Sequence, residues 1–294
     1  MTMDSRNSLS GIVVDSAMRK QAVFLPQSIS ISSAINTLIK QKINGLLTVD
    51  EKGFPAGVLS KTDIMGAYYA DIPIDAPLEY IMSRPPLFCR SDDPLEAALE
   101  QMRVTGVYRL YVVEDEGGPV VGSLAYPDIV GLLYQYCCKC DYSHYRKLPR
   151  RDGESIDRTL VRDCMTKDLK GIYETDSIVV AMEALSANKM GAILVRDRNS
   201  VGVGVISKTD LILAYKHGVN PSDQAHSIMS SPLQSCRSEA LLEDAIRTMI
   251  FSDLHRLFVS EIDSGEIVGV FTLTDAARNK SGSCHACVSS RITV

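Results

Sequence analysis

Apolar positions along the chain alternate between two spacings, and together they predict strands and helices in a repeated order. In the first stretch, apolar residues at helical spacing predict an amphipathic helix through Ile31, Ala34, Ile35, Leu38 and Ile39. Short apolar runs predict strands at 22–25, 45–49 and 54–59, with a turn at 50–53. A last helix over 63–69 completes the order strand, helix, strand, strand, helix.

The same order recurs three more times, so the chain is predicted to contain four similar units. The further predicted elements include strands at 87–89, 108–113, 120–124, 192–195 and 256–259, and helices at 94–102, 178–187 and 241–251.

A seven-residue motif closes each unit: a glycine, two mostly apolar residues, a small or hydroxyl residue, two spacers and an aspartate. The four aspartates are Asp63, Asp128, Asp210 and Asp275. Those of the first and third copies are 147 positions apart (210 − 63), as are those of the second and fourth (275 − 128). A methionine precedes each aspartate by 45 or 46 positions, at Met18, Met82, Met165 and Met229. The chain is therefore a duplicated pair of units.

Each motif is predicted to lie where a short strand ends and a helix begins. The hydroxyl residue then lies near the helix N-cap, and the aspartate falls in the first turn. For a single copy of this pattern, ordinary helix capping is the better explanation. Four copies in register favour a ligand site.

Composition narrows the class of protein. Of 294 residues, 45% are hydrophobic and 23% charged, which is typical of a globular chain with a sizeable core. The net charge of −5 argues against a general nucleic-acid-binding surface. We expect no membrane span, because no apolar run approaches about 18 residues, and no signal peptide, because residues 1–11 are polar. Eight cysteines without a secretion signal indicate thiol or metal chemistry in a reducing compartment, so we expect a cytoplasmic protein.

Four units that each close on this motif resemble tandem CBS domains over roughly residues 13–136 and 160–280. The resemblance implies an α/β (α+β) fold: four βαββα CBS units paired into two Bateman modules with pseudo-twofold symmetry. Whether four units assemble within one chain or by homodimerisation stays open. The expected divisions are a tail at 1–12, units at 13–76, 77–136, 160–220 and 221–280, a cysteine-containing linker at 137–159 and a C-terminal tail at 281–294.

The resemblance also implies a regulatory function. Clefts between paired CBS units would bind an adenine nucleotide (AMP, ADP or ATP) or an S-adenosyl ligand and signal to a regulated protein that the sequence does not identify. The motif aspartate would accept hydrogen bonds from both ribose hydroxyls, because an ionised carboxylate has only acceptor positions. The nucleotide-binding residues expected at the junctions are Ser60, Thr62, Asp63, Ser207, Thr209, Asp210, Thr272, Thr274 and Asp275. Unit two carries Ala125 and Pro127 in its motif, so we expect its site to be weak or empty.

Basic residues start the strand that enters the hairpin in units two and four. Arg109 and Arg256 are 147 positions apart, and His255 precedes Arg256. In CBS modules that sense nucleotide charge, such as the γ subunit of AMP-activated kinase, basic residues at this position approach the phosphates. Arg109, His255 and Arg256 are therefore candidates for phosphate contacts, and Lys61 and Lys208 are weaker ones. A solvated surface position is an equally open interpretation.

Two Cys-x-x-Cys motifs stand at equivalent places in the two halves. Each begins nine positions after a motif aspartate, with Cys137 and Cys140 after unit two and Cys284 and Cys287 after unit four. If a pseudo-twofold axis brings them together, four thiolates would suit zinc or an iron–sulfur cluster. Free thiols copied by duplication and redox switches are the alternatives. The alternative function is thus a metal- or redox-responsive sensor or scaffold.

The sequence contains none of the common catalytic signatures. It lacks a phosphate-binding Gly-x-x-x-x-Gly-Lys, a dinucleotide fingerprint and a His-Glu-x-x-His motif. The four units and their linker occupy the chain, so we expect that the protein is not an enzyme.

Overall fold

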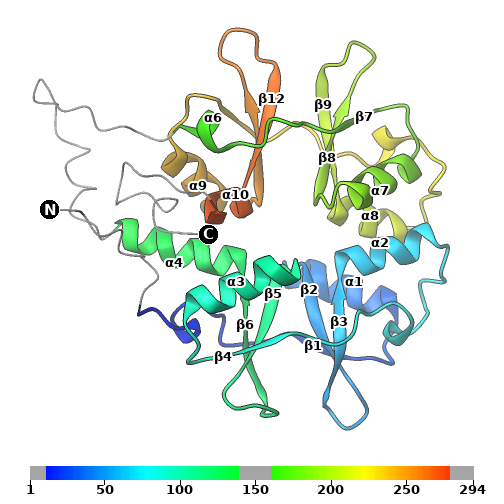
Figure 1. Ribbon diagram of the computed structural model, residues 1–294. Helices are drawn as coiled ribbons and strands as arrows, with labels where there is room; N and C mark the ends of the chain where they lie inside the picture. Colours follow the sequence, from blue (N-terminus) through cyan, green and yellow to red (C-terminus); the bar gives the residue numbers. More distant parts are fainter. Residues whose placement is uncertain (1–10, 139–159, 279–294) are drawn as a thin grey trace, which may run out of the picture. The chain divides into compact units, whose positions relative to one another are not determined.

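The computed structural model describes residues 11–138 and 160–278, with side chains described up to residue 132 in the first range and residue 276 in the second. This part of the chain forms four three-stranded sheets, each with helices beside it (Figure 1). In every sheet the first strand pairs parallel to the second, and the second pairs antiparallel to the third. The predicted α/β fold of four βαββα units is confirmed.

The elements of each unit follow one another in the predicted order. Unit one comprises β1 (Phe24–Pro26), α1 (Ile31–Lys40), β2 (Gly45–Val49), β3 (Pro55–Ser60) and α2 (Lys61–Tyr69). Unit two comprises β4 (Phe88–Arg90), α3 (Leu95–Thr105), β5 (Arg109–Val113), β6 (Val120–Ala125) and α4 (Tyr126–Cys138). Unit three comprises β7 (Gly171–Tyr173), α7 (Ile178–Ala187), β8 (Ala192–Arg196), β9 (Gly202–Ser207) and α8 (Lys208–Lys216). Unit four comprises β10 (Ser235–Arg237), α9 (Leu242–Phe251), β11 (Arg256–Ser260), β12 (Ile267–Thr272) and α10 (Leu273–Arg278). Short helical turns precede them at η1 (Val14–Ser16), η2 (Leu78–Tyr80), α6 (Val161–Cys164) and η3 (Ala225–Ser227).

Helix α1 shows how the apolar pattern forms the core. Its predicted inward face is fully buried at Ile31, Ala34, Ile35 and Leu38. Ser30 caps the helix by accepting a hydrogen bond from the backbone N–H of residue 33. The next strand, β2, is buried at three successive residues, as expected for a strand covered on both faces.

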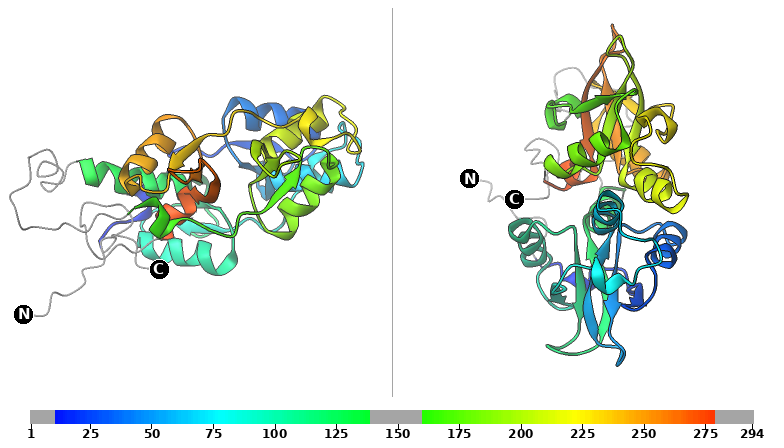
Figure 2. Two further views of the ribbon diagram at one scale, coloured as in Figure 1. Left: turned by 90° about the horizontal axis from the view of Figure 1, so that it is seen from above. Right: turned by 90° about the vertical axis from the view of Figure 1, so that its right-hand side faces the viewer.

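The hairpins of the four units share one irregularity. A β-bulge follows Thr48 in unit one and Val195 in unit three, which are equivalent positions of the repeat. The other two hairpins have the same bulge after Val112 and Val259. The paired strands of the hairpins can also be followed in the views of Figure 2. The duplication is thus preserved down to the register of the strands.

The segments around η1 and η2 are exchanged between units one and two. Val13 and Arg19 form β-bridges with Pro94 and Ser123, which belong to unit two. The segment around η2 turns back to unit one, where Ser83 bridges Val58 of β3. Each sheet is therefore completed by a segment from outside its own run of strands and helices.

Units three and four repeat the exchange. Leu160 and Thr166 bridge unit four, at Leu241 and Val270. Ser230 bridges Val205 of unit three. These bridges stand 147 positions from their counterparts in the first half.

Contacts divide the chain into two compact bodies, which we describe separately. The 1/3 body contains Ala22–Leu87 and Leu169–Leu233, and therefore the sheets of units one and three. Of the described residues, the 2/4 body contains 11–21, 88–138, 160–168 and 234–278, and therefore the sheets of units two and four. The predicted pairing of unit one with unit two, and of unit three with unit four, stays a prediction.

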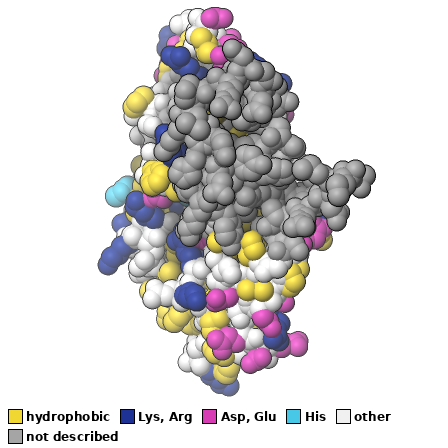
Figure 3. All heavy atoms as spheres, turned by 90° about the vertical axis from the view of Figure 1, so that its left-hand side faces the viewer, with side chains coloured by type: hydrophobic (Ala, Val, Ile, Leu, Met, Phe, Trp, Pro, Cys, Tyr) yellow, Lys and Arg dark blue, Asp and Glu magenta, His cyan; other side chains and the backbone are white. Residues whose placement is uncertain are grey.

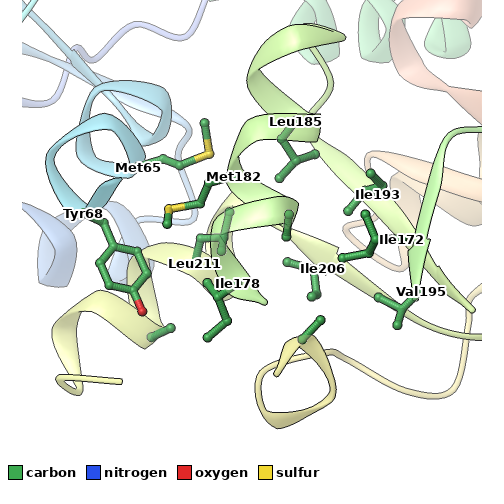
Figure 4. Close-up of a cluster of buried hydrophobic side chains, with 13 residues drawn as sticks. Met65, Tyr68, Ile172, Ile178, Met182, Leu185, Ile193, Val195, Ile206 and Leu211 are labelled. Carbon is green, nitrogen blue, oxygen red and sulfur yellow. The ribbon is translucent and has the colours of Figure 1, made fainter. Parts of the chain in front are cut away.

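The 1/3 body has internal pseudo-twofold symmetry about the contact of α2 with α8. The rings of Tyr68 and Tyr215, equivalent residues of the two helices, stack with centroids 5.0 Å apart and planes at 22°. Tyr68 donates a hydrogen bond of 2.7 Å to the carbonyl of Val219, and Tyr215 donates one to the carbonyl of Ile72. Figure 4 shows Tyr68 and Met65 of α2 beside the buried apolar side chains of unit three.

In the 2/4 body, α4 packs against α10. Within unit two, the rings of Tyr108, just before β5, and Tyr126, the first residue of α4, lie at a centroid distance of 5.3 Å. No helix in the described parts of the chain has the length and apolar character that crossing a membrane requires.

Candidate functional site

Unit one places Ser60 and Asp63 at the junction between β3 and α2. Ser60 is the N-cap of α2, and its hydroxyl oxygen accepts hydrogen bonds from the backbone N–H groups of Thr62 and Asp63. In return, Oδ2 of Asp63 accepts from the Ser60 backbone N–H at 2.7 Å and from the Ser60 hydroxyl at 2.6 Å. This reciprocal capping box stabilises the first helical turn, whose N–H groups have no partners within the helix.

The second oxygen of the Asp63 carboxylate faces a donor from the exchanged segment. Oδ1 accepts a hydrogen bond of 2.8 Å from the hydroxyl of Ser83, an exposed residue. An ionised carboxylate has about four acceptor positions, so the three bonds leave room for about one further donor. A hydroxyl can also rotate, and it can accept as well as donate. A vicinal diol could therefore bind here by adding to the Ser83 hydroxyl or by taking its place.

Unit three repeats the contacts of the carboxylate atom for atom. Oδ2 of Asp210 accepts from the Ser207 backbone N–H at 2.7 Å and from the Ser207 hydroxyl at 2.6 Å. Oδ1 accepts from the hydroxyl of Ser230 at 2.8 Å. The two junctions of the 1/3 body are thus equivalent in geometry as well as in sequence.

The junction of unit four is built from Thr272 and Asp275. Oδ2 of Asp275 accepts from the Thr272 backbone N–H at 2.9 Å and from its hydroxyl at 2.6 Å. The Thr272 hydroxyl oxygen accepts from the Asp275 backbone N–H at 3.1 Å. Thr274, between them, is half-buried. In units one, three and four the hydroxyl residue and the aspartate occupy the helix start, as predicted; ligand binding there stays a prediction.

Unit two departs from the other three junctions. Its carboxylate, Asp128, accepts from the Ala125 backbone N–H at 2.9 Å, and no hydroxyl stands at position 125 to make the reciprocal bond. Its other oxygen, Oδ1, forms a 2.7 Å ion pair with Nε of Arg19. The Asp128 side chain is only 7% exposed. A cation of the chain itself therefore lies against this carboxylate.

The motif glycines explain why a methionine recurs in each unit. A Cβ at Gly57 would lie 2.8 Å from the carbonyl oxygen of Ser83 and 3.0 Å from the sulfur of Met82. Equivalent contacts join Gly204 to Met229 at 2.8 Å. Only glycine allows so close an approach of the exchanged segment to the hairpin.

Lysines link the two junctions of the 1/3 body. Nζ of Lys61, at the start of α2, donates a 2.8 Å hydrogen bond to the hydroxyl of Thr209, at the start of α8. Nζ of Lys208 donates a 2.7 Å bond to the hydroxyl of Thr62. Each helix start therefore receives a cation from the other unit, beside the positive end of the helix dipole. This grouping of positive charge suits an anionic group of a ligand.

The stronger candidates for phosphate contacts, Arg109, His255 and Arg256, lie in the 2/4 body. Arg109 begins β5 and donates a 2.7 Å hydrogen bond to the hydroxyl of Ser123, and Arg256 begins β11. His255 joins unit four's junction through its backbone, because its carbonyl accepts from the N–H of Leu273. Burial raises the pKa of Tyr108 to about 12, while the charges of Arg256 and Arg109 act in the opposite direction. The structure thus brings these two arginines to the surroundings of one half-buried tyrosine.

The predicted metal ligands lie outside the described side chains. Cys137 falls in the last turn of α4, where only the backbone is described, and Cys140, Cys284 and Cys287 fall beyond the described residues. Among the residues that are described, no cluster of histidine, cysteine and carboxylate side chains could hold a metal ion. The metal site stays a prediction from sequence.

The thiols of Cys89 and Cys236 are poorly suited to reactivity. Burial, together with the nearby charge of Asp93, raises the pKa of Cys89 to about 12. Burial alone raises the pKa of Cys236 to about 11. Cys164 is half-buried. A high pKa keeps a thiol protonated and so suppresses its nucleophilic form.

Ser83, Ser230 and Arg19 were not predicted as parts of the junctions. Each follows a methionine of the repeat, and that position was the available signal. The 45- or 46-residue spacing obscured this signal, because it pairs Met82 with Asp128, which follows it in the sequence. In the structure, Met82 instead packs on the junction of unit one, which precedes it. The exchange of segments between units determines which methionine lies beside which aspartate.

The CBS domain family model matches four stretches of the chain, at residues 6–70, 78–134, 161–217 and 225–282. The chain is 22% identical over 209 residues to the uncharacterized protein MJ1225 of Methanocaldococcus jannaschii, a match that covers 70% of this chain and 72% of that protein. The crystal structure of MJ1225 matches with a TM-score of 0.73 at 17% identity, over 90% of this chain and 98% of the other.

Two further solved structures are similar over different lengths. An uncharacterized conserved protein from Pyrococcus horikoshii matches with a TM-score of 0.57 at 18% identity, over 90% of this chain and 97% of that one. The CBS domain protein PAE2072 from Pyrobaculum aerophilum, solved in complex with AMP, covers 40% of this chain and 90% of its own at 25% identity, with a TM-score of 0.38. The first likeness shows the fold, and the AMP complex is a property of PAE2072.

Proposed function

The chain belongs to the CBS-domain family, and from this premise we propose that it is a regulatory protein whose strand–helix junctions bind an adenosyl ligand and whose bound state acts on a partner protein. The junctions at Asp63, Asp210 and Asp275 are the proposed ribose sites. The four family matches identify no catalytic domain, so the proposed output is a change in a partner's activity rather than a reaction.

One observation carries the proposal: the junctions of units one and three combine a diol acceptor with a cation from the opposite unit. Asp63 and Asp210 present carboxylates at helix starts. Lys208 and Lys61 bring their ammonium groups to the same two helix starts. A ribose bearing a phosphate has both of the complementary groups, two hydroxyl donors and an anion.

The surface chemistry agrees with a small-molecule ligand. On the described part of the face in Figure 3, basic and acidic side chains are interspersed. The net charge of the chain is −5. Both features differ from the basic stripe that is typical of nucleic-acid-binding proteins.

The ligand would act through the contact of α2 with α8. Lys61 and Asp63 belong to the first turn of α2, and Tyr68 of the same helix stacks on Tyr215 of α8. A ligand that binds one arrangement of these helices more tightly than another would shift the population toward it. Ligands of different charge would differ in this preference through the two lysines.

The test is calorimetry with AMP, ADP, ATP, S-adenosylmethionine and NAD on the full chain and on the Asp63→Asn, Asp210→Asn double variant. Asparagine is preferred to alanine, because its carbonyl can still accept from the capping N–H while the acceptor for the diol is lost. The control is Glu116→Gln, which removes a carboxylate from the exposed β5–β6 hairpin. We expect saturable binding that the double variant weakens and the control retains. No binding of any ligand by the native chain would overturn the proposal.

A further inference from the structure

In units one, two and three, the residue that follows the repeat methionine donates to the motif carboxylate. Ser83 and Ser230 donate to Oδ1 of Asp63 and Asp210 through a neutral hydroxyl, each at 2.8 Å. In unit two the equivalent residue is Arg19, whose Nε donates to Oδ1 of Asp128 at 2.7 Å. The same acceptor atom, Oδ1, therefore accepts from a hydroxyl in units one and three and from a guanidinium in unit two.

We propose that Arg19 is a built-in occupant of the unit-two junction and keeps that junction closed to the ligand. This inference rests on the proposed function. It removes the unit-two junction from the expected number of ligand sites. A serine hydroxyl can turn to accept a bond from an incoming diol, whereas a guanidinium has donors only and carries a fixed charge. Displacing Arg19 would leave Asp128, a carboxylate 7% exposed, without its cation.

The backbone holds Arg19 in this position. Its N–H donates to the carbonyl of Ser123 at 2.9 Å, and its carbonyl accepts from the N–H of Ser123 at 3.0 Å. Five residues earlier, Val14 is fully buried and its N–H donates to the carbonyl of Asp93. The segment that carries Arg19 is therefore anchored on unit two at two points. The backbone already holds the guanidinium near Asp128.

Charge complementarity explains why an arginine suits only this unit. Ala125 provides no hydroxyl to bond Asp128, so the carboxylate has fewer donors from its own helix start than Asp63 or Asp210. Arg19 does not replace this hydroxyl at Oδ2, but it donates a charge-assisted bond to Oδ1, which is stronger than the neutral bonds from Ser83 and Ser230. Unit four carries Thr166, a hydroxyl residue, at the equivalent position.

The experiment isolates unit two in the full chain. Asp63→Asn, Asp210→Asn and Asp275→Asn disable the other junctions, and Ala125→Ser with Pro127→Thr restores the unit-two motif. Two versions of this chain are compared, one with Arg19 retained and one with Arg19→Ser. AMP, ATP and S-adenosylmethionine are the probes, and calorimetry gives the affinity and the number of sites.

We expect the Arg19→Ser version to bind one equivalent, and the Arg19 version to bind about tenfold more weakly or not at all, as one charge-assisted bond must be given up. Equal binding by both versions, or by neither, would overturn the inference. Circular dichroism checks that both fold.

A second variant decides the matter if the multiply substituted chains do not fold. Asp128→Asn in the otherwise native chain should leave the number of ligand equivalents unchanged, and loss of one equivalent would overturn the inference. Absence of binding by the native chain is a different result: it removes the proposed function, and this inference with it.

Discussion

The ammonium group of Lys61 lies 2.8 Å from the hydroxyl of Thr209, although the two residues belong to different CBS units. The equivalent bond from Lys208 to Thr62 makes the contact reciprocal. The lysine at the start of each helix thus contacts the start of the other helix. The charge that each junction offers to a ligand depends on the integrity of the whole 1/3 body.

Removal of these cations should affect charged ligands selectively. In the Lys61→Met, Lys208→Met variant we expect the affinity for ATP to fall by about tenfold, the effect of losing one to two charge-assisted bonds. The affinity for S-adenosylmethionine should stay within about twofold, because this ligand has no phosphate. Calorimetry on both ligands, with Lys52→Met in the exposed β2–β3 turn as control, checks the difference. An equal loss for both ligands would show that the lysines act through structure alone.

Gly57→Ala should destabilise the 1/3 body. The added Cβ would lie 2.8 Å from a backbone oxygen of Ser83, which cannot move without breaking its bridge to β3. We expect a loss of about 1–3 kcal/mol in the free energy of unfolding, the usual cost of overpacking. Urea denaturation measures it. Gly66→Ala is the control, since a Cβ there meets nothing within 4 Å in α2 and alanine should stabilise the helix by up to about 1 kcal/mol.

The 2/4 body should lose stability in alkali through Tyr108. Its pKa is about 12 in the folded chain against 10.0 for an unperturbed tyrosine. Below pH 10 both states keep the proton and the stabilisation is complete. Between about pH 10 and 12 the unfolded chain releases the proton first, so stability falls as the pH rises. Urea denaturation at pH 8, 10 and 11 should show a smaller fall for Tyr108→Phe than for the native chain, with Tyr80→Phe, an exposed ring, as control.

The Cys-x-x-Cys motifs predict bound metal in protein purified without chelator. We expect zinc by elemental analysis, or visible absorbance if the ligand is an iron–sulfur cluster. Cys137→Ser with Cys284→Ser should lower the metal content, whereas Cys89→Ser, at a buried thiol, should not. Metal-free native protein would leave the redox and duplicated-thiol alternatives.

Local sequence signals predicted the elements and the helix starts well. The spacing through Ile31 and Leu38 identified α1, whose inward face is buried. The hydroxyl and aspartate of the motif identified the N-cap and first turn of α2, although the helix begins at Lys61, two residues before the predicted start at residue 63. Both signals act within a few residues, which is the range over which capping and amphipathicity operate.

The long-range partners could not be predicted in the same way. Arg19 and Asp128 are 109 positions apart, and nothing in the local pattern of either residue points to the other. The exchange of segments also reassigns Met82 from the junction that follows it to the one that precedes it. A repeat fixes which residues are equivalent, but the topology decides which of them meet.

The exchanged segments also limit which part of such a chain can be duplicated as a folded piece. A copy of unit one alone would leave its sheet without the segment around Ser83, and would carry a segment around Arg19 with no sheet to receive it. A copy of units one and two together carries both segments and both receivers. The smallest piece that can be inherited intact is therefore the pair, and the 147-residue period of the sequence is the length of that heritable piece.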